Sequence, residues 1–96
     1  MKSARILRLN SGEQIICELM DDQPDDECIT IKLGFIVALD NEQNRLMYTA
    51  FAPFASATGV VSVRKTSITY ISLPSSQLVD QYVDLLEGNL SLTTNE

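Results

Sequence analysis

Apolar and polar residues alternate along the first part of the chain, and this alternation predicts β-strands. In residues 4–10, Leu7 and Leu9 lie on one face and Arg8 on the other, as a half-buried strand requires. Residues 14–20 repeat the alternation after a short turn of polar and small residues. The two runs therefore predict a β-hairpin.

Three further strands are predicted over residues 28–39, 44–65 and 67–73. Gly34, in the middle of the first of these, predicts a sharp bend or bulge where the sheet curls over its own core. The second is interrupted at residues 52–59, where proline and small residues predict a bulge or loop. The bend favours a small barrel.

The period of the apolar positions changes to that of a helix after Pro74, over residues 75–87. Ser75 or Ser76 is the expected N-cap, and Gly88 is the expected end. We expect the apolar stripe to pack within the domain, although closing the open end of a barrel or meeting a partner are alternatives. The stripe consists of Leu78, Val79, Tyr82, Val83, Leu85 and Leu86.

The length of 96 residues and the apolar content of 45% suffice for one core. We therefore predict one mainly β domain over residues 1–88, a small, strongly bent, five-stranded antiparallel barrel with a C-terminal amphipathic helix. Residues 89–96 are expected to form a frayed tail.

The net charge of −6 is unevenly distributed. Five acidic residues lie within residues 21–27, a stretch that predicts a solvated loop, whereas residues 29–71 carry a net charge of +2. A surface patch for a polyanion is therefore compatible with an acidic chain.

The sequence lacks the residues that several kinds of catalytic or metal site require. The chain contains no histidine, which excludes an imidazole base and histidine metal ligands. The acidic loop lacks the ligand spacing of a calcium-binding loop. Cys17 and Cys28 are predicted to be unbridged, with Cys17 a core side chain. We expect no enzyme activity, no metal site and no cofactor.

No apolar run approaches the roughly 18 to 20 residues that cross a bilayer, and no signal peptide begins the chain. We therefore expect a cytoplasmic protein with no membrane contact.

Two stretches resemble the motifs of Sm-like proteins. Leu7-x-Leu9-x-x-Gly12-x-x-Ile15-x-Cys17-x-Leu19 is similar to the first half of the first Sm motif, with Cys17 where the family usually has glycine. Residues 63–71, Val-Arg-Lys-Thr-Ser-Ile-Thr-Tyr-Ile, resemble the second motif, with Lys65 in place of its glycine. The resemblance covers most of residues 4–74.

The resemblance implies an Sm-like barrel that assembles into a homo-oligomeric ring and binds single-stranded RNA. It implies that Arg64, Lys65 and Thr66 contact the RNA at a tight turn. The expected subunit interface follows from pairing of the strand that ends at Lys65 with the strand that begins at Ser67 of the next subunit, and consists of Val61, Val63, Ile68, Tyr70 and Ile71.

Two departures from the family pattern bear on function. The acidic loop at residues 21–27 has no aromatic side chain where Sm proteins place a base-stacking residue, so RNA binding is expected to be weak. The acidic segments favour the alternative of a ring that binds protein and no RNA. The insertion at residues 52–59 resembles divergent Sm-like proteins of tailed phages, particularly those of marine cyanobacteria.

Overall fold

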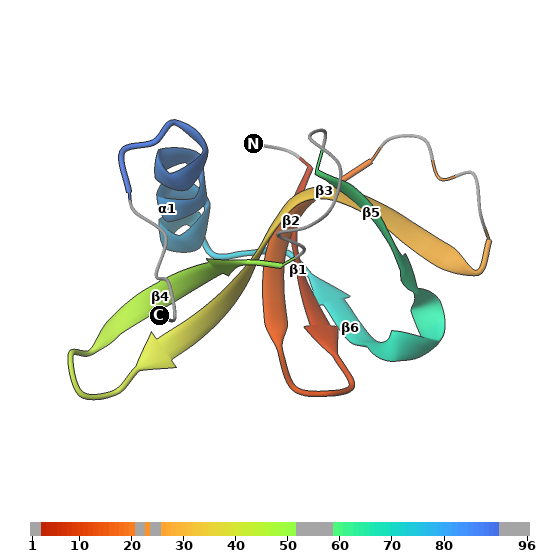
Figure 1. Ribbon diagram of the computed structural model, residues 1–96, viewed down its shortest axis with the longest axis horizontal. Coiled ribbons are helices and arrows are strands. Elements are labelled where there is room, and N and C mark those ends of the chain that lie inside the picture. Colours follow the sequence, from red (N-terminus) through yellow and green to blue (C-terminus); the bar gives the residue numbers. More distant parts are fainter. Residues whose placement is uncertain (1–2, 21–22, 24–25, 52–58, 91–96) are drawn as a thin grey trace.

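The computed structural model describes residues 3–20, 23, 26–51 and 59–90. Within these residues, six strands form one antiparallel sheet, and a single helix follows them (Figure 1). The strands are β1 (Ala4–Leu9), β2 (Gln14–Leu19), β3 (Cys28–Asp40), β4 (Arg45–Ala50), β5 (Val60–Arg64) and β6 (Ile68–Ser72). A short 3-10 turn, η1 (Lys65–Ser67), joins β5 to β6, and the helix is α1 (Ser76–Leu86).

The sheet is ordered β4-β3-β2-β1-β6, and β5 also pairs with β3. The predicted mainly β architecture with a C-terminal helix is thereby confirmed, but the predicted barrel is not closed: no pairing joins β4 or β5 to β6 among the described residues. The predicted strand 44–65 forms two strands, which makes six instead of five. Of the predicted interruption at residues 52–59 and the predicted tail at residues 89–96, residues 52–58 and 91–96 lie outside the described residues.

The β1–β2 hairpin forms where the alternation predicted it. The Leu9 N–H donates to the Glu13 carbonyl at 2.9 Å, and Gly12 adopts a φ of 109°, which glycine accepts without steric cost. Ile15 pairs with Leu7, and Cys17 with Arg5. Both hairpin strands lie in the middle of the sheet, because β6 pairs with β1 and β3 pairs with β2.

The bend in β3 divides this strand into two halves with different partners. Residues 28–32 pair with β5, and residues 35–40 pair with β4. Leu33, and not the neighbouring Gly34, takes the positive φ of 55°. Gly34 instead permits close packing, since a Cβ atom there would lie 3.4 Å from Ile15 Cγ2 and 3.5 Å from Phe51 Cβ. The predicted bend is therefore present, with the strain one residue earlier.

Apolar side chains cover both faces of the central strands, which corrects the prediction of half-buried strands. Ile15, Ile16 and Cys17 are all fully buried although they alternate between faces. On one face the sheet curls around a cluster of Leu7, Leu9, Ile15, Cys17, Ile31 and Val63. On the other face α1 covers a second cluster, which consists of Ala4, Ile6, Ile16, Tyr48, Tyr82 and Leu85.

Helix α1 begins and ends as its sequence predicted. The Ser75 hydroxyl accepts a hydrogen bond from the Leu78 N–H at 3.2 Å. Gly88 has a φ of 80°, and the Asn89 N–H donates to the Asp84 carbonyl at 2.8 Å, which completes a glycine C-cap. The helix packs within the domain on the face of the sheet and does not close the end of a barrel (Figure 1).

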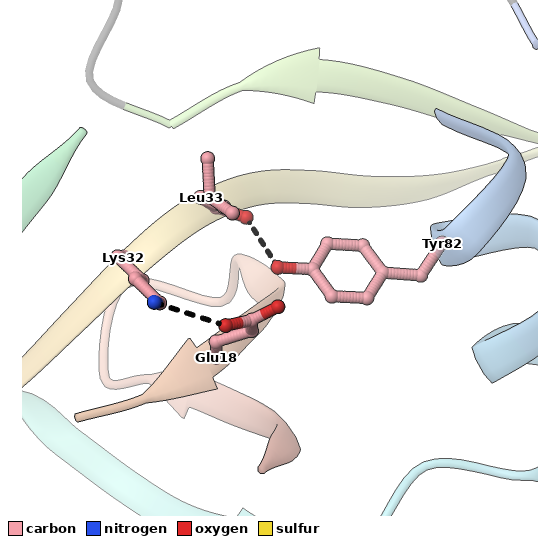
Figure 2. A network of polar contacts seen from close by, with 4 residues as sticks. All are labelled: Glu18, Lys32, Leu33 and Tyr82. Carbon is pink, nitrogen blue, oxygen red and sulfur yellow. Dashed lines mark hydrogen bonds and ion pairs between the residues drawn. The ribbon is translucent and has the colours of Figure 1, made fainter. Parts of the chain in front are cut away.

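Tyr82 connects α1 to the bend in β3 (Figure 2). Its side chain is fully buried, and its hydroxyl donates to the Leu33 carbonyl at 2.7 Å. The ring also makes an edge contact with Phe35, with 6.0 Å between centroids. Burial raises the pKa of the Tyr82 hydroxyl, so the donor stays protonated. Beside it, Glu18 and Lys32 form a cross-strand ion pair at 3.5 Å.

We predict that Tyr82→Phe lowers the free energy of unfolding by about 1–2 kcal/mol, because the Leu33 carbonyl loses its side-chain partner while the ring still fills the core. Urea denaturation measures the change. Tyr70→Phe is the matched control, since Tyr70 is 43% exposed, and it should change stability by less than about 0.5 kcal/mol. Equal stability of the Tyr82→Phe variant and the parent would contradict the assigned bond.

A second prediction concerns Cys17, which like Cys28 forms no disulfide. Burial raises the Cys17 pKa from 9.0 to about 12. Because the thiol has a higher pKa in the folded protein than in the unfolded chain, the unfolded chain loses the proton at a lower pH. Above pH 9 this ionisation favours unfolding, so the protein loses stability as the pH rises towards 12. The free energy of unfolding should fall above pH 9, with a limiting slope of about 1.4 kcal/mol per pH unit.

Urea denaturation between pH 8 and pH 10 tests this second prediction. The Cys17→Ala variant should be less stable at pH 8 because it leaves a cavity, but its stability should depend less on pH. If both proteins show the same slope, the thiol is not the titrating group.

Candidate functional site

The turn that joins β5 to β6 brings together the three predicted RNA-binding residues. Arg64 ends β5, and Lys65 and Thr66 begin η1. All three side chains are exposed. The turn lies at one end of the sheet, where the chain passes from the edge beside β3 to the edge beside β1 (Figure 1).

Asn10, for which the sequence predicted no role at this site, fixes the conformation of η1. Its side-chain amide donates to the Thr66 carbonyl at 2.7 Å, and its side-chain oxygen accepts from the Thr69 hydroxyl at 2.7 Å. Its backbone N–H donates to the Ser67 carbonyl at 2.8 Å. These contacts span more than fifty residues in sequence, so no local pattern predicts them.

The acidic loop ends beside this turn. The Lys65 N–H donates to the Glu27 carbonyl at 2.9 Å, and Cys28 pairs in register with Arg64. Asp26 and Glu27 are both exposed. The backbone of the last loop residues therefore adjoins the backbone of the turn that carries Arg64 and Lys65; Asp21, Asp22 and Asp25 lie outside the described residues.

Gln23 holds together the ends of the strands that flank the acidic loop, and the sequence analysis missed it. Its side-chain NH₂ donates to the carbonyls of Met20 at 2.8 Å and Thr30 at 2.9 Å. Its side-chain oxygen accepts from the Thr30 N–H at 2.8 Å. The side-chain amide of Gln23 thus makes the hydrogen bonds to Thr30 that the backbone of a longer hairpin would have made.

The five predicted interface residues separate into two groups. Val63 is 8% exposed and belongs to the core, and Val61 and Ile68 pack against the same cluster. Tyr70 and Ile71, each 43% exposed, present apolar surface on β6. Of the five side chains, Tyr70 and Ile71 are therefore the most exposed, whereas Val61 and Ile68 are half-buried.

An apolar groove of about 200 Å³ lies between the start of β3, the turn η1 and β6. It is lined by Ile29, Lys65, Ile68, Tyr70 and Ile71. The groove therefore joins the predicted RNA-binding turn to the exposed part of the predicted interface. Its lining is aliphatic and aromatic apart from the Lys65 ammonium.

Within the described part of the chain, no three cysteine or acidic side chains come close enough to hold a metal ion. No helix among the described residues is long and apolar enough to cross a membrane. Known protein-family models and curated proteins were both compared with the chain, and none matches it.

Proposed function

We propose that this chain is an Sm-like protein whose subunits assemble head to tail into a closed ring that binds single-stranded RNA weakly. The observation that carries the proposal is the pair of open strand edges at β5 and β6, with an apolar groove beside them. Open edges of this kind are covered or paired in natural proteins, because their unpaired backbone groups recruit other strands.

The hydrogen bonds between β5 and β3 show which backbone groups of β5 lie on its open edge. The Lys65 N–H donates to the Glu27 carbonyl, and the Leu33 N–H donates to the Gly59 carbonyl. Since hydrogen bonding alternates along an antiparallel pair, Val61 and Val63 also face β3 with their backbone groups. The N–H and C=O groups of Val60, Ser62 and Arg64 face away from β3, where no described strand pairs with them.

The same reasoning applies to β6. The Asn10 N–H bonds the Ser67 carbonyl, and the register passes through a bulge before Tyr70 pairs with Arg8 and Ser72 with Ile6. Between these two pairs, the backbone groups of Ile71 face outward. The outward groups of β5 and β6 belong to different surfaces, so pairing between them is heterologous, and successive subunits close into a ring when the rotation permits.

The groove supports this arrangement because a strand added beside β6 would cover it. Tyr70 and Ile71 expose apolar side chains there, and Leu73, 74% exposed, extends the surface beyond the strand. Val60, 38% exposed, supplies an apolar side chain on the opposing β5 edge. Burial of such surface stabilises association by about 25 cal/mol per Å² before the cost of ordering.

RNA binding is proposed at Arg64, Lys65 and Thr66, whose side chains are exposed and would recur around a ring. Arg64 and Lys65 supply two cations per subunit for phosphate. Asp26 and Glu27 lie on the adjoining loop and oppose a polyanion. This opposition predicts weak, salt-sensitive binding, and it favours a protein-binding ring as the second candidate function.

We predict that Ile71→Asp reduces the assembly to smaller species at micromolar concentration, because it places a charge on the apolar β6 edge. Light scattering measures the mass. Leu39→Asp is the control, since Leu39 is 55% exposed on β3 away from both edges, and it should leave the mass unchanged. A parent protein that is monomeric at micromolar concentration would refute the ring.

For RNA, we predict that Arg64→Ala abolishes most binding of uridine-rich and adenine-rich oligonucleotides and lowers the salt slope by about 1. Arg45→Ala removes an exposed cation on β4 and should leave binding unchanged. Asp26→Asn with Glu27→Gln should strengthen binding by removing repulsion. If the parent binds neither oligonucleotide at low salt, the protein-binding ring becomes the better proposal.

A further inference from the structure

A second open surface lies on the hairpin formed by β4 and the second half of β3, away from the β5 and β6 edges. This hairpin extends from the body of the sheet, and α1 lies beside it (Figure 1). Between them is a groove of about 440 Å³, here called the α1 groove. Its lining includes Leu39, Leu46 and Leu90, together with Arg45, Gln81 and Asp84.

The apolar face of the hairpin continues beyond the area that α1 covers. Tyr48 is 2% exposed, lies under the helix and bonds Gln81 with its hydroxyl. Two residues earlier on the same face, Leu46 is 36% exposed, and its register partner Leu39 is 55% exposed. Together with Leu90, 37% exposed, they form apolar surface without cover from the described residues.

The outer edge of β4 borders this groove and offers backbone pairing. The Phe51 N–H donates to the Gly34 carbonyl, so the alternation directs the backbone groups of Thr49, Met47 and Arg45 towards β3. The N–H and C=O groups of Leu46, Tyr48 and Ala50 face the other way. No described strand pairs with that edge, because β4 ends the sheet order.

The charge on α1 indicates what kind of segment would fit. Residues 76–90 contain Asp80, Asp84 and Glu87, all exposed, and no lysine or arginine. Asp84 and Glu87 lie at the C-terminal end of the helix, where the helix dipole is negative and acidic side chains are unfavourable. Arg45, at the start of β4, is the cation among the lining residues named above. A cation bound against α1 would relieve this unfavourable charge.

We propose that the α1 groove binds an extended segment of a partner protein that carries apolar and basic side chains. The segment adds to the open edge of β4 as a further strand, so that Leu46, Tyr48 and Ala50 gain backbone partners. On the face towards the groove, its apolar side chains contact Leu46 and Leu90, and its basic side chain contacts Asp84. The groove lies within one subunit, so the proposal does not depend on ring assembly.

An eight-residue peptide tests the proposal, with threonine at every second position and leucine alternating with lysine between them. In an extended peptide this order places leucine and lysine on one face. Fluorescence anisotropy at low salt should show binding to the full chain, and a peptide with glutamate in place of lysine should bind more weakly. Hydrogen exchange should slow at the amides of Leu46, Tyr48 and Ala50.

Two aspartates on the same helix give a matched pair of variants. Asp84→Asn should weaken binding of the lysine peptide by roughly two- to fivefold, the range for one exposed ion pair. Asp80→Asn should leave the affinity unchanged, because Asp80 does not line the groove. Leu46→Ser should weaken binding through lost apolar contact. Ile71→Asp, which tests the ring, should leave peptide affinity unchanged.

Three outcomes would overturn the proposal. Equal binding of the lysine and glutamate peptides would mean apolar adhesion only. Equal losses in Asp80→Asn and Asp84→Asn would place the peptide elsewhere on α1. A mass increase of the peptide-free protein that Leu46→Ser abolishes and Ile71→Asp does not would assign the groove to a second copy of the chain.

Discussion

The bend at Leu33 and Gly34 is the constraint on which the rest of the structure depends. It divides β3 between two partners, so β4 and β5 leave this strand in different directions. The bend needs one residue in the left-handed backbone conformation and one residue without a side chain. Leu33 adopts the left-handed conformation, and Gly34 is the residue without a side chain. A leucine at positive φ is unfavourable, so neighbouring contacts have to hold it there.

Those contacts come from three parts of the chain. The Tyr82 hydroxyl bonds the Leu33 carbonyl, the Gly59 carbonyl accepts the Leu33 N–H, and the Phe51 N–H bonds the Gly34 carbonyl. The first of these explains why α1 belongs to the fold. The helix covers one face of the sheet and also holds the bend, which in turn sets where the edges of β4 and β5 lie.

The position of these edges links the fold to the proposed functions. The first half of β3 carries β5 and the turn at residues 64–66, and the second half carries β4 and the α1 groove. One bent strand thereby separates two open edges that differ in surroundings. Beside β5 and β6 lie an apolar groove and two cations, whereas beside β4 lies an acidic helix. Surfaces of unlike charge on one subunit favour different partners.

The sequence by itself determined the elements, because strand alternation, helical period and cap residues act over a few neighbouring positions. It predicted the hairpin, the bend near Gly34, and a helix after Pro74 with Ser75 or Ser76 as its N-cap and Gly88 at its end. Only the tertiary structure decided which faces of the strands are buried. Ile6 and Ile16, for example, are covered by α1, which lies sixty or more residues later in the sequence. It also decided the roles of Asn10, Gln23 and Tyr82, whose hydrogen-bond partners are set by how the chain folds back on itself and by no local pattern.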